Sequence, residues 1–179
     1  MNADGHGQLR DIVAPRLDVL FCGINPGLLA IRSGHHFEGR GNRFWRVLHL
    51  AGFTPETLTP DRDASLVRFG YGITAVVGRA TAGADELRTA DFIAARPAFE
   101  AKIARLAPRV VAFLGKAAYA GLSGRHDIAW GRQAATIGSS RVWILPNPSG
   151  RNRSFSLEQL VAAYGELQRA VRQDLDTVA

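Results

Sequence analysis

The chain has 179 residues, of which 46% are hydrophobic and 21% charged, so we expect a soluble globular protein with an ordinary core and exclude a disordered one. Its 22 lysines and arginines outnumber 16 acidic residues, and the formal net charge of +6 suits a polyanionic partner such as nucleic acid. The single cysteine, Cys22, excludes an intramolecular disulfide and a cysteine-based zinc site, and we expect neither a signal peptide nor a membrane span, which requires roughly 20 apolar residues.

The beginning of the chain predicts a loose segment, a buried strand and a helix. Residues 1–15 are polar and form the expected lead-in. The apolar run at 17–24 is closed by turn-forming residues, which is typical of a buried strand. Residues 28–41 show no clear period and are expected to form a loop. Asn42 is placed to cap a helix over 43–52, and a phosphate contact is the alternative role for its side chain.

The middle of the chain predicts two further strands and a long helix. Residues 53–69 contain two prolines and several acidic residues, and we expect a loop with a short helix there. A second strand is expected at 70–77 and a third at 109–114. The helix between them is expected at 91–106, with Pro97 marking either its beginning or a kink.

The last third of the chain predicts a short helix, a fourth strand and a final helix. The short helix should lie at 116–122 and the strand at 141–145. Ser156 then caps the last helix, with Glu158 and Gln159 placed as in a capping box. Because apolar runs alternate with helices, the sequence predicts an α/β fold with a mainly parallel sheet.

Two turns that open with asparagine follow the first and the fourth predicted strands. They are Asn25-Pro26-Gly27 and Asn147-Pro148-Ser149-Gly150. Each turn alone is ordinary turn chemistry, since asparagine and glycine tolerate positive φ and proline fixes φ. In open α/β sheets, however, ligands bind beyond the carboxyl ends of the strands. We therefore expect the two turns to meet at one site.

Three segments around these turns resemble a known family. They are Phe21-Cys22-Gly23-Ile24-Asn25-Pro26-Gly27-Leu28, Gly41-Asn42-Arg43-Phe44-Trp45 and Leu145-Pro146-Asn147-Pro148-Ser149-Gly150. Together they resemble the mismatch-specific uracil/thymine-DNA glycosylase family, in order from Leu17 to Arg169. The resemblance implies the fold of the uracil-DNA glycosylase superfamily in a single domain over 1–179, with three α/β/α layers and a central, mainly parallel, four-stranded sheet. It also implies a monofunctional DNA glycosylase of base excision repair, which flips uracil, thymine or ethenocytosine out of a G·U-type or G·T-type mismatch and hydrolyses its N-glycosidic bond.

The resemblance assigns the chemistry to the first turn. Asn25 matches the residue that positions the attacking water, and because a carboxamide is a poor base we expect a slow enzyme. The base pocket should contain Ile24, Gly27, Ala30, Phe37 and Asn147. Phe37 matches a residue that stacks on the flipped base, and a plain core position is its alternative. Ala30 replaces a serine and Ala75 a lysine of other members, which leaves the preferred base open.

The second turn matches the loop that enters the duplex. Arg151 stands where the family often has a leucine wedge, and its planar guanidinium would fill the gap left by the flipped base. Arg153 should contact either the guanine that is left unpaired when the opposite base is flipped out or a phosphate, with a solvated surface arginine as the alternative. Backbone amides at Ser149 and Gly150, together with Lys116 at a helix start, are expected to contact phosphates.

Two other functions fit parts of this pattern. A non-catalytic module that binds mismatches or abasic sites would share the basic loop. An α/β enzyme acting on a small molecule is disfavoured, because no Gly-x-Ser-x-Gly motif, Cys/His pair or phosphate loop is visible. Asp85, Glu86 and Asp91 are expected to be solvated or capping residues, with a reach into the pocket as the alternative. We expect a monomer that binds double-stranded DNA in a bacterial-type cytoplasm, without membrane, metal or cofactor.

Overall fold

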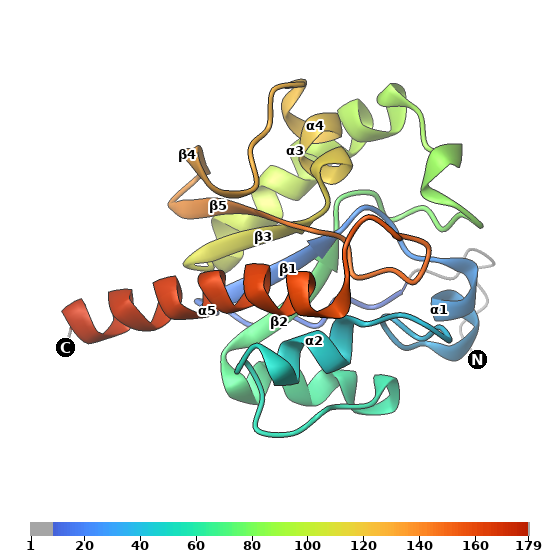
Figure 1. Ribbon diagram of the computed structural model, residues 1–179. Coiled ribbons are helices and arrows are strands. Elements are labelled where there is room, and N and C mark those ends of the chain that lie inside the picture. Colours follow the sequence, from blue (N-terminus) through green and yellow to red (C-terminus); the bar gives the residue numbers. More distant parts are fainter. Residues whose placement is uncertain (1–8, 179) are drawn as a thin grey trace.

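The computed structural model describes residues 9–178, which form a five-stranded sheet with helices on both of its faces (Figure 1). The strands, in the spatial order β2-β1-β3-β5-β4, are β1 (Val19–Gly23), β2 (Tyr71–Ala75), β3 (Val110–Leu114), β4 (Gly131–Ile137) and β5 (Ser140–Leu145). β1 pairs in parallel with β2 and β3, and β3 pairs in parallel with β5. The predicted α/β class with a mainly parallel sheet is therefore confirmed.

The sheet has five strands where the sequence predicts four, and the additional strand is β4. Its sequence, Gly-Arg-Gln-Ala-Ala-Thr-Ile, alternates half-buried and exposed positions and contains no apolar run. The strand lies at the edge of the sheet, antiparallel to β5, and a turn at Gly138 with φ of 56° connects the two. An edge strand does not need the continuous apolar sequence of a central parallel strand, so the search for apolar runs missed it.

The helices are α1 (Leu28–Ser33), α2 (Phe44–Leu50), α3 (Thr89–Leu106), α4 (Lys116–Ser123) and α5 (Leu157–Val178), with short 3-10 helices η1 (Pro60–Phe69) and η2 (Ala84–Glu86). The predicted cap at Ser156 is confirmed, whereas Asn42 lies one residue before the N-cap of α2, which is Arg43, and binds the first helical N–H from there. The Phe44 N–H donates to Asn42 Oδ1 at 3.0 Å. At the start of α5, the Gln159 N–H donates to Ser156 Oγ at 3.2 Å and the Ser156 N–H donates to Gln159 Oε1 at 2.8 Å, which is a capping box.

Three predictions about local structure need correction. Residues 28–41 are not a loop throughout, because they begin with α1, whose six residues before Gly34 are too few to show a helical period. Pro97 does not mark the beginning of the helix, because α3 begins at Thr89 and Pro97 lies inside it at an exposed position, where water can bind the carbonyl that its missing N–H leaves free. Of the predicted lead-in, residues 1–8 lie outside the described residues, and the remainder is not loose, since Ile12 pairs with Ile73 through two backbone hydrogen bonds.

The core consists of two apolar layers, one on each face of the sheet. Along β1, Val19 and Phe21 belong to one layer, whereas Leu20 and Cys22 belong to the other. Helices α2 and α5 cover the first face, and α3 and α4 cover the second, as Figure 1 shows. Burial raises the pKa of the Cys22 thiol, so this group stays protonated and belongs to the core. None of the described helices combines the length and the hydrophobicity that a membrane span requires.

Candidate active site

A cavity of about 530 Å³ opens at the carboxyl ends of the parallel strands. The last residues of β1, β2 and β3, which are Gly23, Ala75 and Leu114, form part of its wall. Most of the residues predicted for the site also line it, namely Ile24, Asn25, Gly27, Ala30, Phe37, Asn147, Ser149 and Arg151. The fold therefore brings the first loop (residues 24–27) and the second loop (residues 146–155) to one place.

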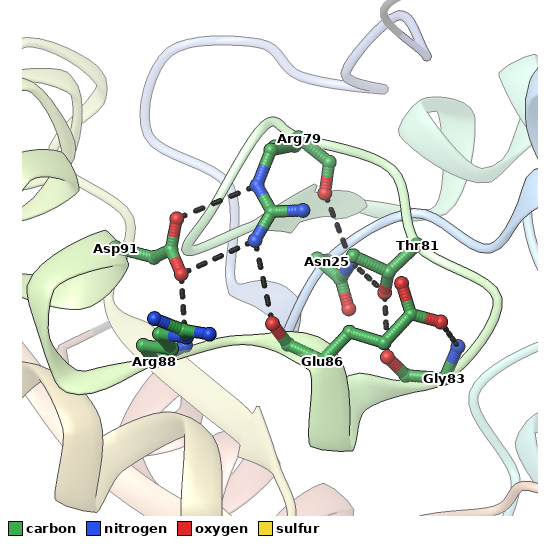
Figure 2. A network of polar contacts seen from close by, with 7 residues as sticks. All are labelled: Asn25, Arg79, Thr81, Gly83, Glu86, Arg88 and Asp91. Atoms are coloured by element: carbon green, nitrogen blue, oxygen red, sulfur yellow. Dashed lines mark hydrogen bonds and ion pairs between the residues drawn. The ribbon is translucent and has the colours of Figure 1, made fainter.

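The side chain of Asn25 has a defined orientation in this cavity (Figure 2). Its Nδ2 donates to the backbone oxygen of Arg79 at 2.9 Å and to Thr81 Oγ1 at 2.7 Å. The Thr81 hydroxyl in turn donates its only hydrogen to the Gly83 oxygen at 2.8 Å, so it can only accept from Asn25. Both neighbours of Nδ2 are therefore acceptors, and the amide nitrogen must face them.

The consequence is that Asn25 presents its oxygen to the cavity. Among the hydrogen bonds of the described residues, none uses Asn25 Oδ1. A free carboxamide oxygen accepts a hydrogen bond from water and orients the molecule, but it does not remove a proton. The first loop contains no carboxylate, so within the described residues it provides orientation rather than strong general-base catalysis.

Phe37 forms a wall of the cavity in a strained backbone conformation. Its φ is 54°, in the left-handed region that side chains other than glycine rarely adopt. The conformation is held through the preceding residue, whose N–H donates to Asp63 Oδ2 at 2.9 Å and whose oxygen accepts from Trp45 Nε1 at 3.2 Å. The ring of Phe37 stacks on buried Phe44 with 3.9 Å between centroids. One ring face is thus covered by Phe44, and Phe37 also lines the cavity.

The second loop is held by a residue to which the sequence assigned no role, Arg43. Its guanidinium donates to four backbone oxygens of the loop, those of Pro148 (3.3 Å), Ser149 (3.0 Å), Asn152 (2.7 Å) and Phe155 (2.7 Å). The backbone N–H of Arg43 also donates to the Pro148 oxygen at 3.0 Å. Because the partners lie 105–112 residues away in the sequence, no local pattern could have revealed this role.

Asn147 complements Asn25 in hydrogen-bonding character. Its Oδ1 accepts from the Ser149 N–H at 2.9 Å, which fixes the amide and leaves Nδ2 without a hydrogen-bond partner among the described residues. The cavity therefore contains a free acceptor on Asn25 and a free donor on Asn147. Gly150 does not line the cavity, but it allows the second loop to approach the segment before α2, since a Cβ at this position would lie 2.7 Å from the Gly41 oxygen.

The basic residues of the prediction occupy three different positions. Arg151 is exposed at the cavity and its Nη1 lies 3.5 Å from the oxygen of Ala82, which also lines the cavity, so the contact is a long one. Arg153 is exposed and has no hydrogen bond or ion pair among the described residues. Lys116 does not line the cavity, and its Nζ lies 4.6 Å from the centroid of the Trp130 ring.

The three acidic residues near the site have separate roles. Asp91 accepts from the Arg88 N–H at 2.8 Å and pairs with Arg79 at 3.2 Å, and both contacts lower the pKa of its carboxyl group. Glu86 accepts from the Gly83 N–H at 3.1 Å at the start of η2. Both are capping residues, as expected from the sequence, whereas exposed Asp85 lines the cavity. No group of three metal-binding side chains occurs in the described part of the chain.

Two comparisons with known proteins bear on the family and the fold. A model of the uracil DNA glycosylase superfamily matches residues 10–168. Among solved structures, the solution NMR structure of a candidate uracil DNA glycosylase from Methanosarcina acetivorans is similar in fold, with a TM-score of 0.61. The alignment covers 91% of this chain and 98% of that chain at 18% sequence identity, so it shows the fold alone.

Proposed function

The chain belongs to the uracil DNA glycosylase superfamily, and on this premise we propose that it is a monofunctional glycosylase that removes uracil from G·U mismatches in double-stranded DNA. Membership of the superfamily makes it a DNA glycosylase, a hydrolase that acts on DNA. The observation that carries the finer proposal is the orientation of Asn25, whose two amide hydrogens are bound and whose oxygen is free in the cavity.

The proposed reaction begins with extrusion of the base into the cavity. Unpairing costs a few kcal/mol and costs least at a mismatch, which favours G·U over A·U pairs. Phe37 stacks on the base, and Asn147 Nδ2 donates to one of its oxygens. This donor stabilises the negative charge that the base gains as its bond to the sugar breaks.

Asn25 then orients the water that completes the hydrolysis. The C1′–N bond breaks and its electron pair remains on the base, so the sugar becomes oxocarbenium-like. A water molecule that donates one hydrogen to Asn25 Oδ1 directs a lone pair at C1′, from the side opposite the base. Its oxygen bonds to C1′ and its surplus proton passes to solvent. The base anion takes a proton from solvent on its nitrogen, so the products are the free base and an abasic sugar with a C1′ hydroxyl.

The lining of the cavity supports a monofunctional enzyme. A bifunctional glycosylase needs an amine that forms a Schiff base with C1′. Among the described residues, no lysine lines the cavity. We therefore propose that the abasic strand stays intact after the base is released.

The second loop is proposed to enter the duplex with Arg151 as the wedge. Arg43 fixes the backbone of this loop, whereas the Arg151 side chain is exposed. To enter the duplex it needs to break only its long contact with the Ala82 oxygen. Arg153, exposed on the same loop, is proposed to contact the unpaired guanine opposite the flipped base or a phosphate. Lys116 lies outside the cavity, at the start of α4, and is proposed to contact a phosphate.

The choice of base is proposed to depend on Ala30 and Ala75. Both line the cavity with side chains of a single methyl group, and Ala30 is buried. Small side chains at these positions leave room beside a uracil for a substituent on the ring. We propose that thymine and ethenocytosine are accepted in addition to uracil.

The test is base release from an end-labelled duplex that contains one G·U pair, with matched A·U, G·T and G·ethenocytosine duplexes. We expect strand breaks only after alkali, and faster release from G·U than from A·U. Breaks without alkali would contradict a monofunctional enzyme, and equal rates on G·U and A·U would contradict mismatch selection. Tight binding without any release at stoichiometric protein would instead indicate a module that only binds mismatches.

A further inference from the structure

The orientation of Asn25 depends on a segment far away in the sequence, residues 79–91, which follows β2 and extends into the first turn of α3 (Figure 2). We propose that Thr81, together with the Arg79–Asp91 ion pair, is a positioning device for the Asn25 carboxamide. The device keeps the amide nitrogen turned away from the cavity, so that the oxygen faces the attacking water. This inference rests on the proposed function.

Thr81 is suited to this role because its hydroxyl has fixed polarity. The residue is 4% exposed, and its N–H donates to the Pro26 oxygen at 3.2 Å, which docks it onto the first loop. Since its hydroxyl hydrogen is used by the Gly83 oxygen, the lone pairs of Oγ1 are left for Asn25 Nδ2. Valine has nearly the shape of threonine but lacks this acceptor, so the substitution removes the polarity and keeps the packing.

Arg79 provides the second acceptor, and its own side chain holds that acceptor in place. Its Nε and Nη2 lie 3.4 and 3.2 Å from the two carboxylate oxygens of Asp91, and Nη2 also reaches the Glu86 oxygen at 3.5 Å. Asp91 is anchored at the beginning of α3, where it accepts from the Arg88 N–H at 2.8 Å. A chain of contacts thus runs from α3 through Asp91 and Arg79 to Asn25.

The device matters because a rotated carboxamide would have the wrong polarity. With the amide nitrogen in the cavity, Asn25 would donate to one lone pair of the water and would no longer accept the hydrogen that aligns the other lone pair with C1′. The rotated oxygen would also face the Arg79 oxygen, which is an acceptor. Both acceptors therefore oppose the unproductive rotamer, and loss of the Thr81 acceptor weakens that opposition.

The ion pair is expected to act on geometry rather than on stability. The side chains of Arg79 and Asp91 are 51% and 26% exposed, and exposed ion pairs contribute little to folding. The chain offers a matched control on the same helix, the exposed pair of Arg96 and Glu100 at 2.8 Å, which has no contact with Asn25. A variant at Arg96 therefore reports the general effect of losing an exposed ion pair.

The experiment compares Thr81→Val, Thr81→Ser, Asp91→Asn and Arg96→Ala by single-turnover release of uracil from a G·U duplex, with the Kd for DNA and Tm measured in parallel. We expect Thr81→Val to slow release roughly 10-fold, the size of one neutral hydrogen bond, with Kd nearly unchanged and a lower Tm because the Gly83 oxygen also loses its donor. Thr81→Ser should stay within about 2-fold of the wild type because it keeps the hydroxyl, and Asp91→Asn should fall between these two. Equal rates for Thr81→Val and the wild type would overturn the proposal, as would an equal loss in Arg96→Ala.

Two further measurements separate this proposal from the proposed function. In an Asn25→Ala background, Thr81→Val should have no additional effect on the rate, and an independent effect there would contradict a role through Asn25. Exchange of the Asn25 Nδ2 hydrogens, followed by NMR and assigned with Asn25→Ala, needs no activity. We expect slow exchange in the wild type and Thr81→Ser and fast exchange in Thr81→Val. Unchanged exchange in Thr81→Val would overturn the positioning role, whether or not the wild type releases uracil. A wild type that releases no uracil would contradict the proposed function instead.

Discussion

The two loops of the cavity are held in different ways. In the first loop the side chain is fixed, because both amide hydrogens of Asn25 are bound to residues of the 79–91 segment. In the second loop the backbone is fixed, because Arg43 binds four of its oxygens. The side chain of Arg151 is exposed and has one contact at 3.5 Å.

This difference matches what each loop is proposed to do. A group that orients a water molecule must hold its direction throughout the reaction, so its side chain needs partners on every side but one. A side chain that enters a duplex must leave its resting position, so only the loop backbone that carries it needs to be rigid. The four predictions below test this division, beginning with the largest expected effect.

Removal of the Asn25 side chain should produce the largest loss. We expect Asn25→Ala to slow uracil release at least about 100-fold, because the attacking water loses its orienting acceptor. The Kd for a G·U duplex should change little, because the DNA-contacting loop is intact. Single-turnover kinetics and fluorescence anisotropy measure the two quantities. A rate within a few-fold of the wild type would assign the orientation of water to another group.

Removal of Arg43 should loosen the second loop and lower stability. The variant Arg43→Ala leaves four backbone oxygens without their charged donor, and we expect a loss of about 2 kcal/mol in the free energy of unfolding. Urea unfolding measures this loss. Arg46→Ala, an exposed neighbour on α2, is the control and should change stability by less than about 0.5 kcal/mol. Similar losses in both variants would show that Arg43 does not hold the loop.

Removal of the Arg151 side chain should have a smaller effect than either. We expect Arg151→Ala to slow release roughly 5-fold and to weaken binding to an abasic product, without loss of stability, because the side chain has one weak contact in the protein. The control is Arg153→Ala on the same loop, which should mainly reduce the salt dependence of DNA binding, by a slope of about 1. Wild-type rates and abasic-site affinity in Arg151→Ala would exclude it as the wedge.

The smallest effect concerns pH and the wall of the cavity beside Phe37. Burial lowers the pKa of His36 from its usual 6.5, although the Arg10 oxygen at 2.8 Å and nearby Asp63 partly oppose this. The unfolded chain therefore binds a proton at a higher pH than the folded protein does, and stability should fall as the pH drops below 6.5 and level off below the folded pKa. Urea unfolding at a series of pH values measures the slope. His36→Gln should flatten it, and an unchanged slope would assign the effect to other groups.

Local signals in the sequence predicted the central strands, the helix start next to Asn42 and the capping box at Ser156. Those elements depend on neighbouring residues, through continuous apolar runs and short side chains at helix starts. The same approach missed β4, whose alternating polar sequence needs only one neighbouring strand, and α1, which is shorter than two full turns.

In the candidate site, too, the features that depend on local sequence were predicted and the contacts between distant residues were not. The two asparagine turns were predicted to meet because parallel strands end at one edge of a sheet, and the cavity contains both of them. The residues that hold the turns were not predicted. Arg43 lies more than 100 residues from its partners and Thr81 lies 56 residues from Asn25, so their contacts exist only in the folded chain.

The most direct test of this division of labour is the single-turnover rate of uracil release from two duplexes, one with a G·U pair and one with uracil opposite an abasic site. Uracil opposite an abasic site has no partner to leave, so its extrusion costs less. We predict that Arg151→Ala is slower than the wild type on the G·U duplex and nearly equal to it on the unpaired uracil, whereas Asn25→Ala is slow on both. Recovery of Asn25→Ala on the unpaired uracil would contradict the account, because Asn25 would then act in extrusion rather than in the hydrolysis.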